Sequence, residues 1–417
     1  MARLPVVLLC FLCCGVAAAE HLVTTGRGDD IPVRIHAADG DRLILWLPSE
    51  FGVSPRRVAL AEALAARGIE VWAPDLHATW FLPVGRYSLN EVDPAAVSQV
   101  ISAAIAHGAK SVYLMAEGRS VALALASVRH WQQTTDSTAS LAGLLAFGPR
   151  LYVRTPQGGE AAEYLPIAGA SNLPIYILQP EDSSGFWRIG DDVRELEKGG
   201  SPVFVQRLPK VSDGFYAREV SSPAEDAMTR RLPGILQQAM NQLQAYNGTP
   251  AQPATLRGRQ RPPEKPVGSA LLRPYPAERE APALRLQSLR GDTVDLINLR
   301  RKVVLINFWT TWCPPCVEEI PSLQRLHTQL QADGLEILAV DVGESAQTLE
   351  SFLRDKPIRF PVLLDSDGDA LRDWGIYAFP TTLVLDRRHR IRYAVFGAFD
   401  WTSPEVLSTL RTLLAED

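Results

Sequence analysis

Two kinds of apolar pattern alternate along residues 42–209. Continuous apolar runs of strand length are separated by stretches in which apolar residues recur at helical spacing. The expected strands are RLILWLP (42–48), IEVWAPD (69–75), SVYLMAE (111–117), LAGLLAFGP (141–149), LPIYILQPED (173–182) and SPVFVQRLP (201–209), with helices over 56–68, 95–108 and 120–130. Because such strands are apolar on both faces, the pattern predicts an α/β domain over residues 20–245, with a parallel sheet covered by helices on both sides.

A second α/β pattern occupies the end of the chain. A hairpin is expected over 286–302, strands over 303–309, 335–342, 360–365, 381–386 and 391–398, and helices over 314–331, 345–356 and 404–416. Between the two patterns, residues 246–282 are rich in Pro, Arg and small polar residues and lack hydrophobic periodicity. We therefore expect a linker over 246–282 and a second domain over 283–417.

The first residues read as a targeting segment. MARLPVVLLCFLCCGVAAAE has a positive charge at Arg3, an apolar run, and three alanines before Glu20. This layout predicts a secretory signal peptide over residues 1–19 and hence a periplasmic protein. An uncleaved membrane anchor and a lipid-modified cysteine remain alternatives, although a spanning helix needs about 20 apolar residues.

Charge and cysteine content narrow the class of protein. The net charge of −5 and the lack of a basic face argue against a nucleic-acid partner. Of the five cysteines, three lie in the targeting segment, so Cys313 and Cys316 are those expected in the mature chain. One close pair does not make a disulfide-stapled scaffold.

Cys313 and Cys316 lie where an apolar strand meets an amphipathic helix, in TTWCPPCVEEIP. At a helix N-terminus, exposed N–H groups and the helix dipole stabilise a thiolate. We therefore expect Cys313 to attack disulfides and Cys316, one turn inside the helix, to resolve the mixed disulfide.

The sequence VVLINFWTTWCPPCVEEIPSL, followed downstream by WGIYAFPTTLVLD, resembles the TlpA/ResA-like thiol-disulfide oxidoreductases of the thioredoxin superfamily. The resemblance covers nearly all of 283–417. It implies a thioredoxin-like domain in which Pro380 forms a cis peptide bond beside the cysteines, and a substrate groove lined by Trp312, Phe379, Pro380 and Thr381. It also implies protein clients with thiols or disulfides, a membrane protein as electron donor, and no cofactor beyond the Cys313–Cys316 disulfide.

Three positions depart from the pattern or refine it. Asn307 stands where thioredoxin has a buried acid, so that route for a proton to Cys316 is missing. Glu319 matches a glutamate that lies near the site in ResA-like members; here it either tunes the thiols and relays a proton, or is only a solvated helix residue. Thr381 stands where the cytochrome-maturation branch usually has an acid, which disfavours apocytochrome as the substrate.

The cysteine pair has three other interpretations besides redox exchange: a zinc site, a structural disulfide and a Cu(I) site. A zinc site needs four ligands, and neither a second Cys pair nor a close His pair accompanies this one, so no metal site is expected. A purely structural disulfide would leave Trp312 and the FPTT segment without a reason to occur together. A pair of thiolates that holds Cu(I) is the stronger rival.

The order of elements in 20–245 is similar to that of an α/β-hydrolase whose catalytic residues are lost. In the strand–turn–helix position of the nucleophile, Ala116-Glu117-Gly118-Arg119-Ser120 places Gly118 where the attacking side chain belongs. Asp182 fits the acid position, but Asp213 stands where a histidine is expected, and Ser120 fits a helix serine or cap better than a nucleophile.

We therefore expect an exported thiol-disulfide oxidoreductase whose first domain is a catalytically silent binding module. A copper-site thiol chaperone or adapter, and a hydrolase with a rearranged site, are the alternatives. The direction of electron flow, the client and the oligomeric state are left open by the sequence, because the Pro-Pro between the cysteines does not fix the redox potential.

Overall fold

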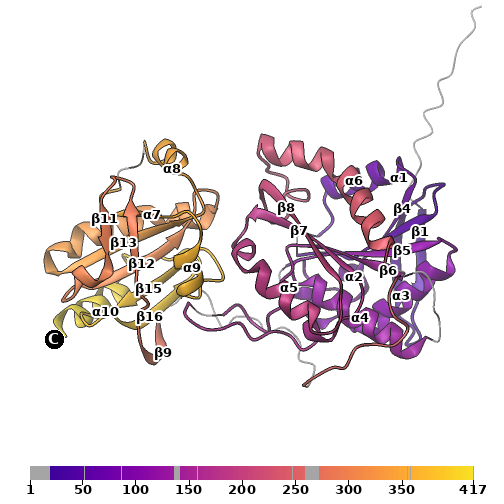
Figure 1. The fold of residues 1–417 in the computed structure, drawn as a ribbon, viewed down its shortest axis with the longest axis horizontal. Coiled ribbons are helices and arrows are strands. Elements are labelled where there is room, and N and C mark those ends of the chain that lie inside the picture. Colours follow the sequence, from indigo (N-terminus) through magenta and orange to yellow (C-terminus); the bar gives the residue numbers. More distant parts are fainter. Residues whose placement is uncertain are drawn as a thin grey trace, which may run out of the picture.

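The structure is a computed structural model that describes residues 19–50, 52–85, 87–135, 141–156, 158–246, 248–258, 272–354, 356 and 358–416. It has two eight-stranded sheets, one in each half of the chain (Figure 1). The predicted signal peptide lies outside the described residues, except for Ala19, which begins the first strand.

The N-terminal sheet has the strand order β1-β2-β4-β3-β5-β6-β7-β8. Its strands are β1 (Ala19–Thr24), β2 (Asp30–His36), β3 (Arg42–Trp46), β4 (Ile69–Pro74), β5 (Ser111–Glu117), β6 (Leu141–Phe147), β7 (Ile175–Asp182) and β8 (Val203–Ser212). Strands β3 to β8 run parallel, whereas β1 and β2 pair antiparallel and β2 is antiparallel to β4. The predicted parallel sheet is confirmed, and the two antiparallel edge strands, whose apolar positions alternate with polar ones, are additions to it.

Helices cover both faces of this sheet, as predicted. On one face pack α1 (Pro55–Ala65) and α6 (Pro223–Gln244), and on the other α3 (Pro94–Ala106), α4 (Ser120–Thr134) and α5 (Ile189–Glu197). The sequence analysis did not include α6, although its start carries a capping box in which Ser222 and Glu225 hydrogen-bond each other's backbone N–H groups. The short helices of the chain are α2 (Leu76–Thr79), η1 (Ser88–Glu91), η2 (Ala168–Ala170), η3 (Ser184–Arg188), η4 (Leu296–Leu299) and η5 (Gln331–Asp333).

The C-terminal sheet has the order β11-β10-β14-β13-β12-β15-β16-β9. Its strands are β9 (Arg273–Glu280), β10 (Arg285–Ser288), β11 (Thr293–Asp295), β12 (Val303–Trp309), β13 (Leu335–Val342), β14 (Val362–Asp365), β15 (Thr381–Leu385) and β16 (Arg390–Phe396). Helices α7 (Pro314–Leu330), α8 (Ala346–Leu353) and α10 (Pro404–Ala415) pack on one face, and α9 (Asp369–Asp373) on the other. All the strands and helices predicted for this domain are present.

Strand β9 lies inside the range predicted as a linker. It pairs antiparallel with β16 at the edge of the C-terminal sheet. The Pro- and Arg-rich composition of 246–282 pointed to extended chain without partners, but an edge strand tolerates proline because only one of its sides must donate to the sheet. The linker prediction was therefore wrong for Arg273–Glu280.

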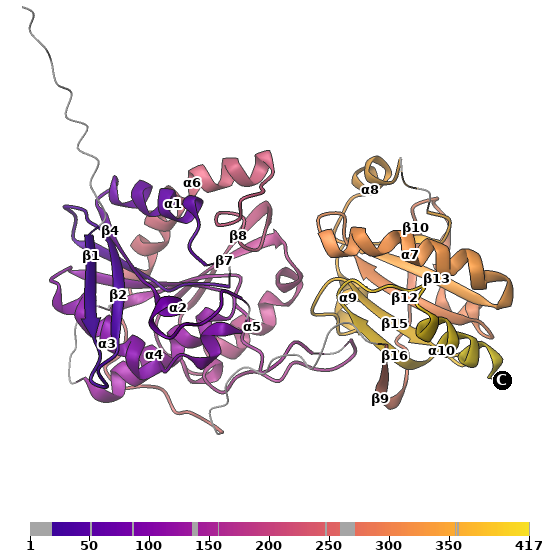
Figure 2. The same ribbon diagram turned by 180° about the vertical axis from the view of Figure 1, so that it is seen from behind.

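Helix α9 lies on the side of the C-terminal domain that faces the N-terminal domain (Figures 1 and 2). The two domains contact each other through η3 and α9. The Arg188 guanidinium donates to the carbonyl oxygens of Leu371 (3.4 Å) and Arg372 (3.1 Å). It also lies 4.4 Å from the centroid of the Tyr377 ring. The neighbouring Trp187 packs so closely on Gly368 that a Cβ added there would lie 2.3 Å from the indole. These contacts hold the edge of the C-terminal domain near α9 against the N-terminal domain.

Among the described residues, none of the helices is both long enough and apolar enough to cross a membrane.

Candidate active site

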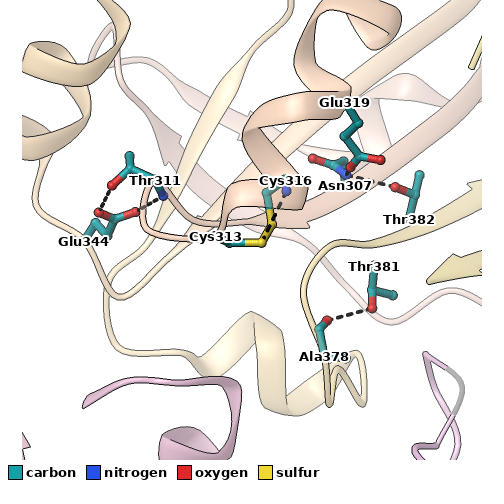
Figure 3. Close-up of a disulfide and its surroundings, with 9 residues drawn as sticks. All are labelled: Asn307, Thr311, Cys313, Cys316, Glu319, Glu344, Ala378, Thr381 and Thr382. Carbon is teal, nitrogen blue, oxygen red and sulfur yellow. Dashed lines mark hydrogen bonds between the residues drawn. A yellow bond between two sulfur atoms is a disulfide. The ribbon is translucent and has the colours of Figure 1, made fainter. Parts of the chain in front are cut away.

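Cys313 and Cys316 lie at the start of α7 and form a disulfide, with their Cα atoms 5.3 Å apart. Strand β12 ends at Trp309, and the prolines at 314 and 315 occupy the first turn of the helix, where a missing N–H costs no hydrogen bond. Cys313 is the N-cap residue, and its Sγ accepts a hydrogen bond of 3.3 Å from the Cys316 N–H (Figure 3). The expected position of the pair at a helix N-terminus is confirmed.

This geometry favours Cys313 as the attacking residue. The same N–H group and the positive end of the helix dipole face the Cys313 sulfur and stabilise it as a thiolate when the disulfide is reduced. Cys313 is 6% exposed and Cys316 is 1% exposed. An incoming disulfide can therefore reach Cys313 more readily than Cys316.

Glu319 is buried rather than solvated, with 3% of its surface exposed. Its carboxyl accepts hydrogen bonds from Asn307 Nδ2 (2.7 Å) and from Trp401 Nε1 (3.4 Å). Asn307 also donates to the Thr382 hydroxyl (2.9 Å), as Figure 3 shows. Asn307 thus does not replace the buried acid that thioredoxin has at this position. Instead it holds the Glu319 carboxyl in the protein interior, one helical turn beyond Cys316.

The burial of Glu319 changes its acidity. Desolvation raises the pKa of Glu319 to about 7, although the hydrogen bonds from Asn307 and Trp401 act in the opposite direction. A carboxyl group with a pKa near neutrality can both give and take a proton. The sequence left two interpretations of Glu319 open, a residue that acts on the thiols and a solvated helix residue. Its burial excludes the second.

The residues expected around the cysteines divide into two pairs. Trp312 and Phe379 are half-buried and meet edge to face, with ring centroids 5.8 Å apart. Pro380 follows Phe379 through a cis peptide bond, as expected, and is buried. Thr381 is also buried, and its hydroxyl donates to the Ala378 carbonyl (2.8 Å) within its own turn. Trp312 and Phe379 are therefore the members of the predicted groove that present surface beside Cys313.

The turn before Cys313 is held in place by a residue that follows the neighbouring strand β13. The Glu344 carboxylate, which follows β13, accepts hydrogen bonds from the Thr311 backbone N–H (2.6 Å) and from the Thr311 hydroxyl (2.5 Å) (Figure 3). Two hydrogen bonds to one carboxylate restrict the turn that leads to the cysteines. Nothing in the sequence pattern marked Glu344, because it lies in a loop more than thirty residues from the motif.

Cys313 opens into a cleft of about 320 Å³ that both domains line. From the C-terminal domain come Trp312, Cys313, Pro314, Ala378 and Phe379. From the N-terminal domain come the three positions that the sequence analysis compared with the catalytic positions of a hydrolase, and several charged side chains around them. Those three positions are Gly118, Asp182 and Asp213.

Gly118 has the backbone conformation that a nucleophile turn needs. It lies between β5 and α4 with φ of 56°, in the left-handed region that glycine adopts without strain. Ser120 is buried; its hydroxyl accepts from the Glu117 N–H (3.0 Å) and donates to the Glu117 carbonyl (2.8 Å). Ser120 thus closes a local turn, as the sequence analysis favoured.

Three of the charged side chains that line the cleft, Arg150, Asp213 and Glu117, have partners within the N-terminal domain. Arg150 donates to Asp213 (2.7 Å). Burial acts to lower the pKa of Arg150, but Asp213, Tyr152 and Glu50 together raise it above its ordinary value. Glu117 is buried and accepts from the Tyr216 hydroxyl (2.7 Å), and desolvation raises its pKa to about 7. Desolvation also raises the pKa of Asp182 to about 6. Two of the cleft's acids are thus partly protonated near neutral pH.

Among the residues that the structure describes, no group of three or more His, Cys, Asp or Glu side chains is arranged to hold a metal ion.

Comparison with known proteins places residues 277–394 in the AhpC/TSA family. The thiol-disulfide oxidoreductase ResA of Bacillus thuringiensis subsp. konkukian is 30% identical over 119 residues, which are 28% of this chain and 69% of that protein. ResA of Geobacillus thermodenitrificans is 36% identical over 117 residues, 28% of this chain and 67% of that protein. A secreted thiol-disulfide isomerase from Corynebacterium glutamicum is a solved structure with 27% identity and a TM-score of 0.33, over 37% of this chain and 96% of its own.

The matched relatives are thiol-disulfide oxidoreductases, and residues 277–394, which match the family model, include the disulfide at the start of α7. The C-terminal half of the protein resembles thioredoxin-like folds. Through this domain the chain belongs to the ResA family of thiol-disulfide oxidoreductases.

Proposed function

We propose that the protein is an exported reductase of client disulfides that works through Cys313 and Cys316, with its N-terminal domain as a binding module. The observation that carries the redox role is the Cys316 N–H directed at the Cys313 sulfur from the first turn of α7. Export rests on the signal-like residues 1–19, and a membrane thiol donor would return electrons to the pair.

In the reduced protein, the Cys313 thiolate attacks one sulfur of a client disulfide and releases the other as a thiolate. Cys316 then attacks the Cys313 sulfur, which forms the Cys313–Cys316 disulfide and frees the second client thiol. For this step Cys316 must lose its proton, and Glu319 is the buried carboxyl one helical turn away. We assign to Glu319 the role of taking that proton.

For the N-terminal domain we propose an α/β-hydrolase-like fold without hydrolase chemistry. The strand order with an antiparallel β2, and the left-handed Gly118 between β5 and α4, support this fold. Gly118 has no nucleophile, and Asp213 is bound to Arg150 where a histidine base would be required. A fluorophosphonate probe that reacts with activated serines should leave this domain unlabelled, and labelling would contradict a silent module.

The redox proposal is tested by the reduction potential of the Cys313–Cys316 couple, measured in the mature protein against dithiothreitol or glutathione buffers. A value near that of thioredoxin, about −270 mV, supports a reductant that needs an electron source. A value near about −120 mV, as in DsbA, would instead make the protein a disulfide donor and reverse the proposed direction.

Two cysteine variants test the assigned roles. Cys316→Ser should accumulate a mixed disulfide between Cys313 and a client, visible by mass spectrometry without reductant. Cys313→Ser should form none and should not reduce insulin. A mixed disulfide on Cys316 in the second variant would contradict the assignment of Cys313 as the attacking residue.

A further inference from the structure

Cys313 is reached through the cleft between the domains. Only 6% of Cys313 is exposed, and the cleft that it lines has N-terminal walls at Gly118, Asp182 and Asp213. The contacts of Arg188 with Leu371 and Arg372 tie the two domains beside it. A volume of about 320 Å³ suits a small molecule and is at the lower end for ligand pockets.

Arg119 differs from the other arginines of the cleft. Arg150 is paired with Asp213 and Arg218 with Glu225, whereas Arg119 forms no ion pair with any described residue. One edge of its guanidinium makes only long hydrogen bonds to neutral oxygens, at 3.4 Å to the Tyr87 hydroxyl and 3.3 Å to the Thr155 hydroxyl.

The other edge of Arg119 is unused. Its Nη1 is buried and has no hydrogen-bond partner. Desolvation lowers the pKa of Arg119, and the Tyr87 hydroxyl and the Glu50 carboxylate, with which Arg119 forms no ion pair, offset this effect only in part. The Tyr87 ring lies 4.6 Å from the guanidinium and restricts its orientation. A carboxylate is the ligand that a buried, oriented and unpaired guanidinium edge recognises best.

We propose that the cleft binds a low-molecular-weight disulfide that carries a carboxylate, with Arg119 holding the carboxylate and Cys313 attacking the sulfur. This proposal rests on the proposed redox function and names a substrate class for it. The former catalytic pocket of the N-terminal domain becomes the substrate pocket of the C-terminal cysteines.

The reaction balances without a further reagent. The Cys313 thiolate forms a bond to one sulfur of the ligand and breaks the ligand's S–S bond, so one ligand thiolate leaves and takes a proton from solvent. Cys316 then bonds to the Cys313 sulfur and releases the second ligand thiol. The ligand disulfide is reduced to two thiols, and the protein dithiol is oxidised to the Cys313–Cys316 disulfide.

The test follows oxidation of the pre-reduced full-length mature protein by stopped-flow tryptophan fluorescence. Two small disulfides are compared, dithiodipropionate, which carries two carboxylates, and the uncharged hydroxyethyl disulfide. The readout is the ratio of their rate constants, measured for the wild type, Arg119→Gln, Arg119→Lys and the control Arg27→Gln. Arg27 is an exposed arginine of the N-terminal domain that pairs with Asp93.

The two disulfides differ in intrinsic reactivity, but this difference is the same for every variant. It therefore cancels when the ratio of rate constants is compared between variants. Arg119→Gln should lower the ratio about tenfold, Arg119→Lys should retain part of it, and Arg27→Gln should keep the wild-type value. An unchanged ratio in Arg119→Gln would overturn the proposal while the redox function stands. If neither disulfide oxidises the reduced wild type although insulin does, the proposal fails and the redox function stands; if insulin does not oxidise it either, both fail.

A measurement on the wild type alone guards against misfolding of the variants. Thiodipropionate has the two carboxylates but no disulfide, and it should slow the alkylation of reduced Cys313 by iodoacetamide. No protection at millimolar concentrations would contradict the assigned site. Faster oxidation by insulin than by dithiodipropionate, with the same loss in Arg119→Gln, would reassign the cleft to a polypeptide segment and overturn the small-molecule assignment.

Discussion

Cys313 and Gly118 line the same cleft, although they belong to different domains and lie almost two hundred residues apart in the sequence. Gly118 lies in the turn between β5 and α4, and the cleft beside it also contains a sulfur of the other domain. The N-terminal domain is therefore more than a tether, because it forms walls around the redox centre.

This arrangement predicts that loosening the domain contact exposes Cys313. Trp187→Ala removes the indole that packs on Gly343 and Gly368. In the reduced protein, alkylation of Cys313 by a bulky polyethylene-glycol maleimide should become faster on the order of tenfold, because truncating a half-buried aromatic side chain at an interface can cost about 1.4 kcal/mol, which is tenfold in an equilibrium constant. The measurement is a gel-shift time course.

The matched control is Phe81→Ala, which removes an aromatic side chain that is 93% exposed. It should leave the rate unchanged. If Trp187→Ala accelerates the bulky reagent no more than it accelerates iodoacetamide, the domain contact does not limit access to Cys313.

A second prediction concerns Glu319 and pH. Burial raises the pKa of Glu319 to about 7 in the folded protein, above the value of about 4.5 expected in the unfolded chain. Between these values the unfolded chain binds fewer protons, so the free energy of unfolding falls as pH rises. Relative to Glu319→Gln, the oxidised wild type should lose about 3 kcal/mol between pH 4 and pH 8. Urea unfolding across this range measures the difference.

Glu318 is the adjacent glutamate on the exposed face of α7, and Glu318→Gln serves as the control. Its difference from the wild type should vary little with pH. A wild-type protein that gains stability over Glu319→Gln between pH 5 and pH 7 would mean that the folded protein lowers the pKa of Glu319, contrary to the effect of its burial.

Local patterns in the sequence were enough to predict the cysteine site. The strand before Cys313, the helix start and the cis bond before Pro380 depend on residues that are close in the chain or on a motif with a known geometry. The burial of Glu319 was left open, because position 319 borders both the apolar and the polar face of α7. Its partners Asn307 and Trp401 come from other elements, which helical spacing does not report.

The cleft could not be predicted in the same way. It depends on contacts such as those of Trp187 and Arg188 with α9, and single side chains in short loops carry no periodicity. Arg119 stands out because its Nη1 is buried without a hydrogen-bond partner. A missing partner can be recognised only when the positions of the neighbouring residues are known. Strand β9 was missed because proline and arginine obscure the pattern of an edge strand.

A third prediction uses the backbone of Gly118. An alanine at φ of 56° pays the cost of the left-handed conformation, about 1–2 kcal/mol, while its Cβ would meet no atom closer than Arg150 Cγ at 4.0 Å. Gly118→Ala should therefore lower the free energy of unfolding by that amount without any steric clash. Urea unfolding is again the measurement.

Gly234 in α6 provides the opposite case, because it has no left-handed backbone and a Cβ there would enter open space, although Pro233 precedes it in the helix. Gly234→Ala should raise the free energy of unfolding by about 0.5–1 kcal/mol. Equal effects of the two substitutions would show that the conformation at Gly118 is not the cause of the loss.

The pair of Arg150 and Asp213 predicts a coupling that a double-mutant cycle can isolate. Asp213 holds Arg150 at 2.7 Å and also accepts from the Ser183 hydroxyl at 3.2 Å. In Asp213→Asn the buried guanidinium loses its carboxylate, and we expect a loss of about 1–2 kcal/mol, moderated because about a third of the Asp213 side chain is exposed. Arg150→Gln should add little to that loss, so the coupling energy should exceed about 1 kcal/mol.

The exposed pair of Arg27 and Asp93 should give a smaller coupling, because solvent screens it. Two equal couplings would mean that the walls of the cleft are as solvated as the outer surface, and that Arg119, with no carboxylate of its own, has no special affinity for one.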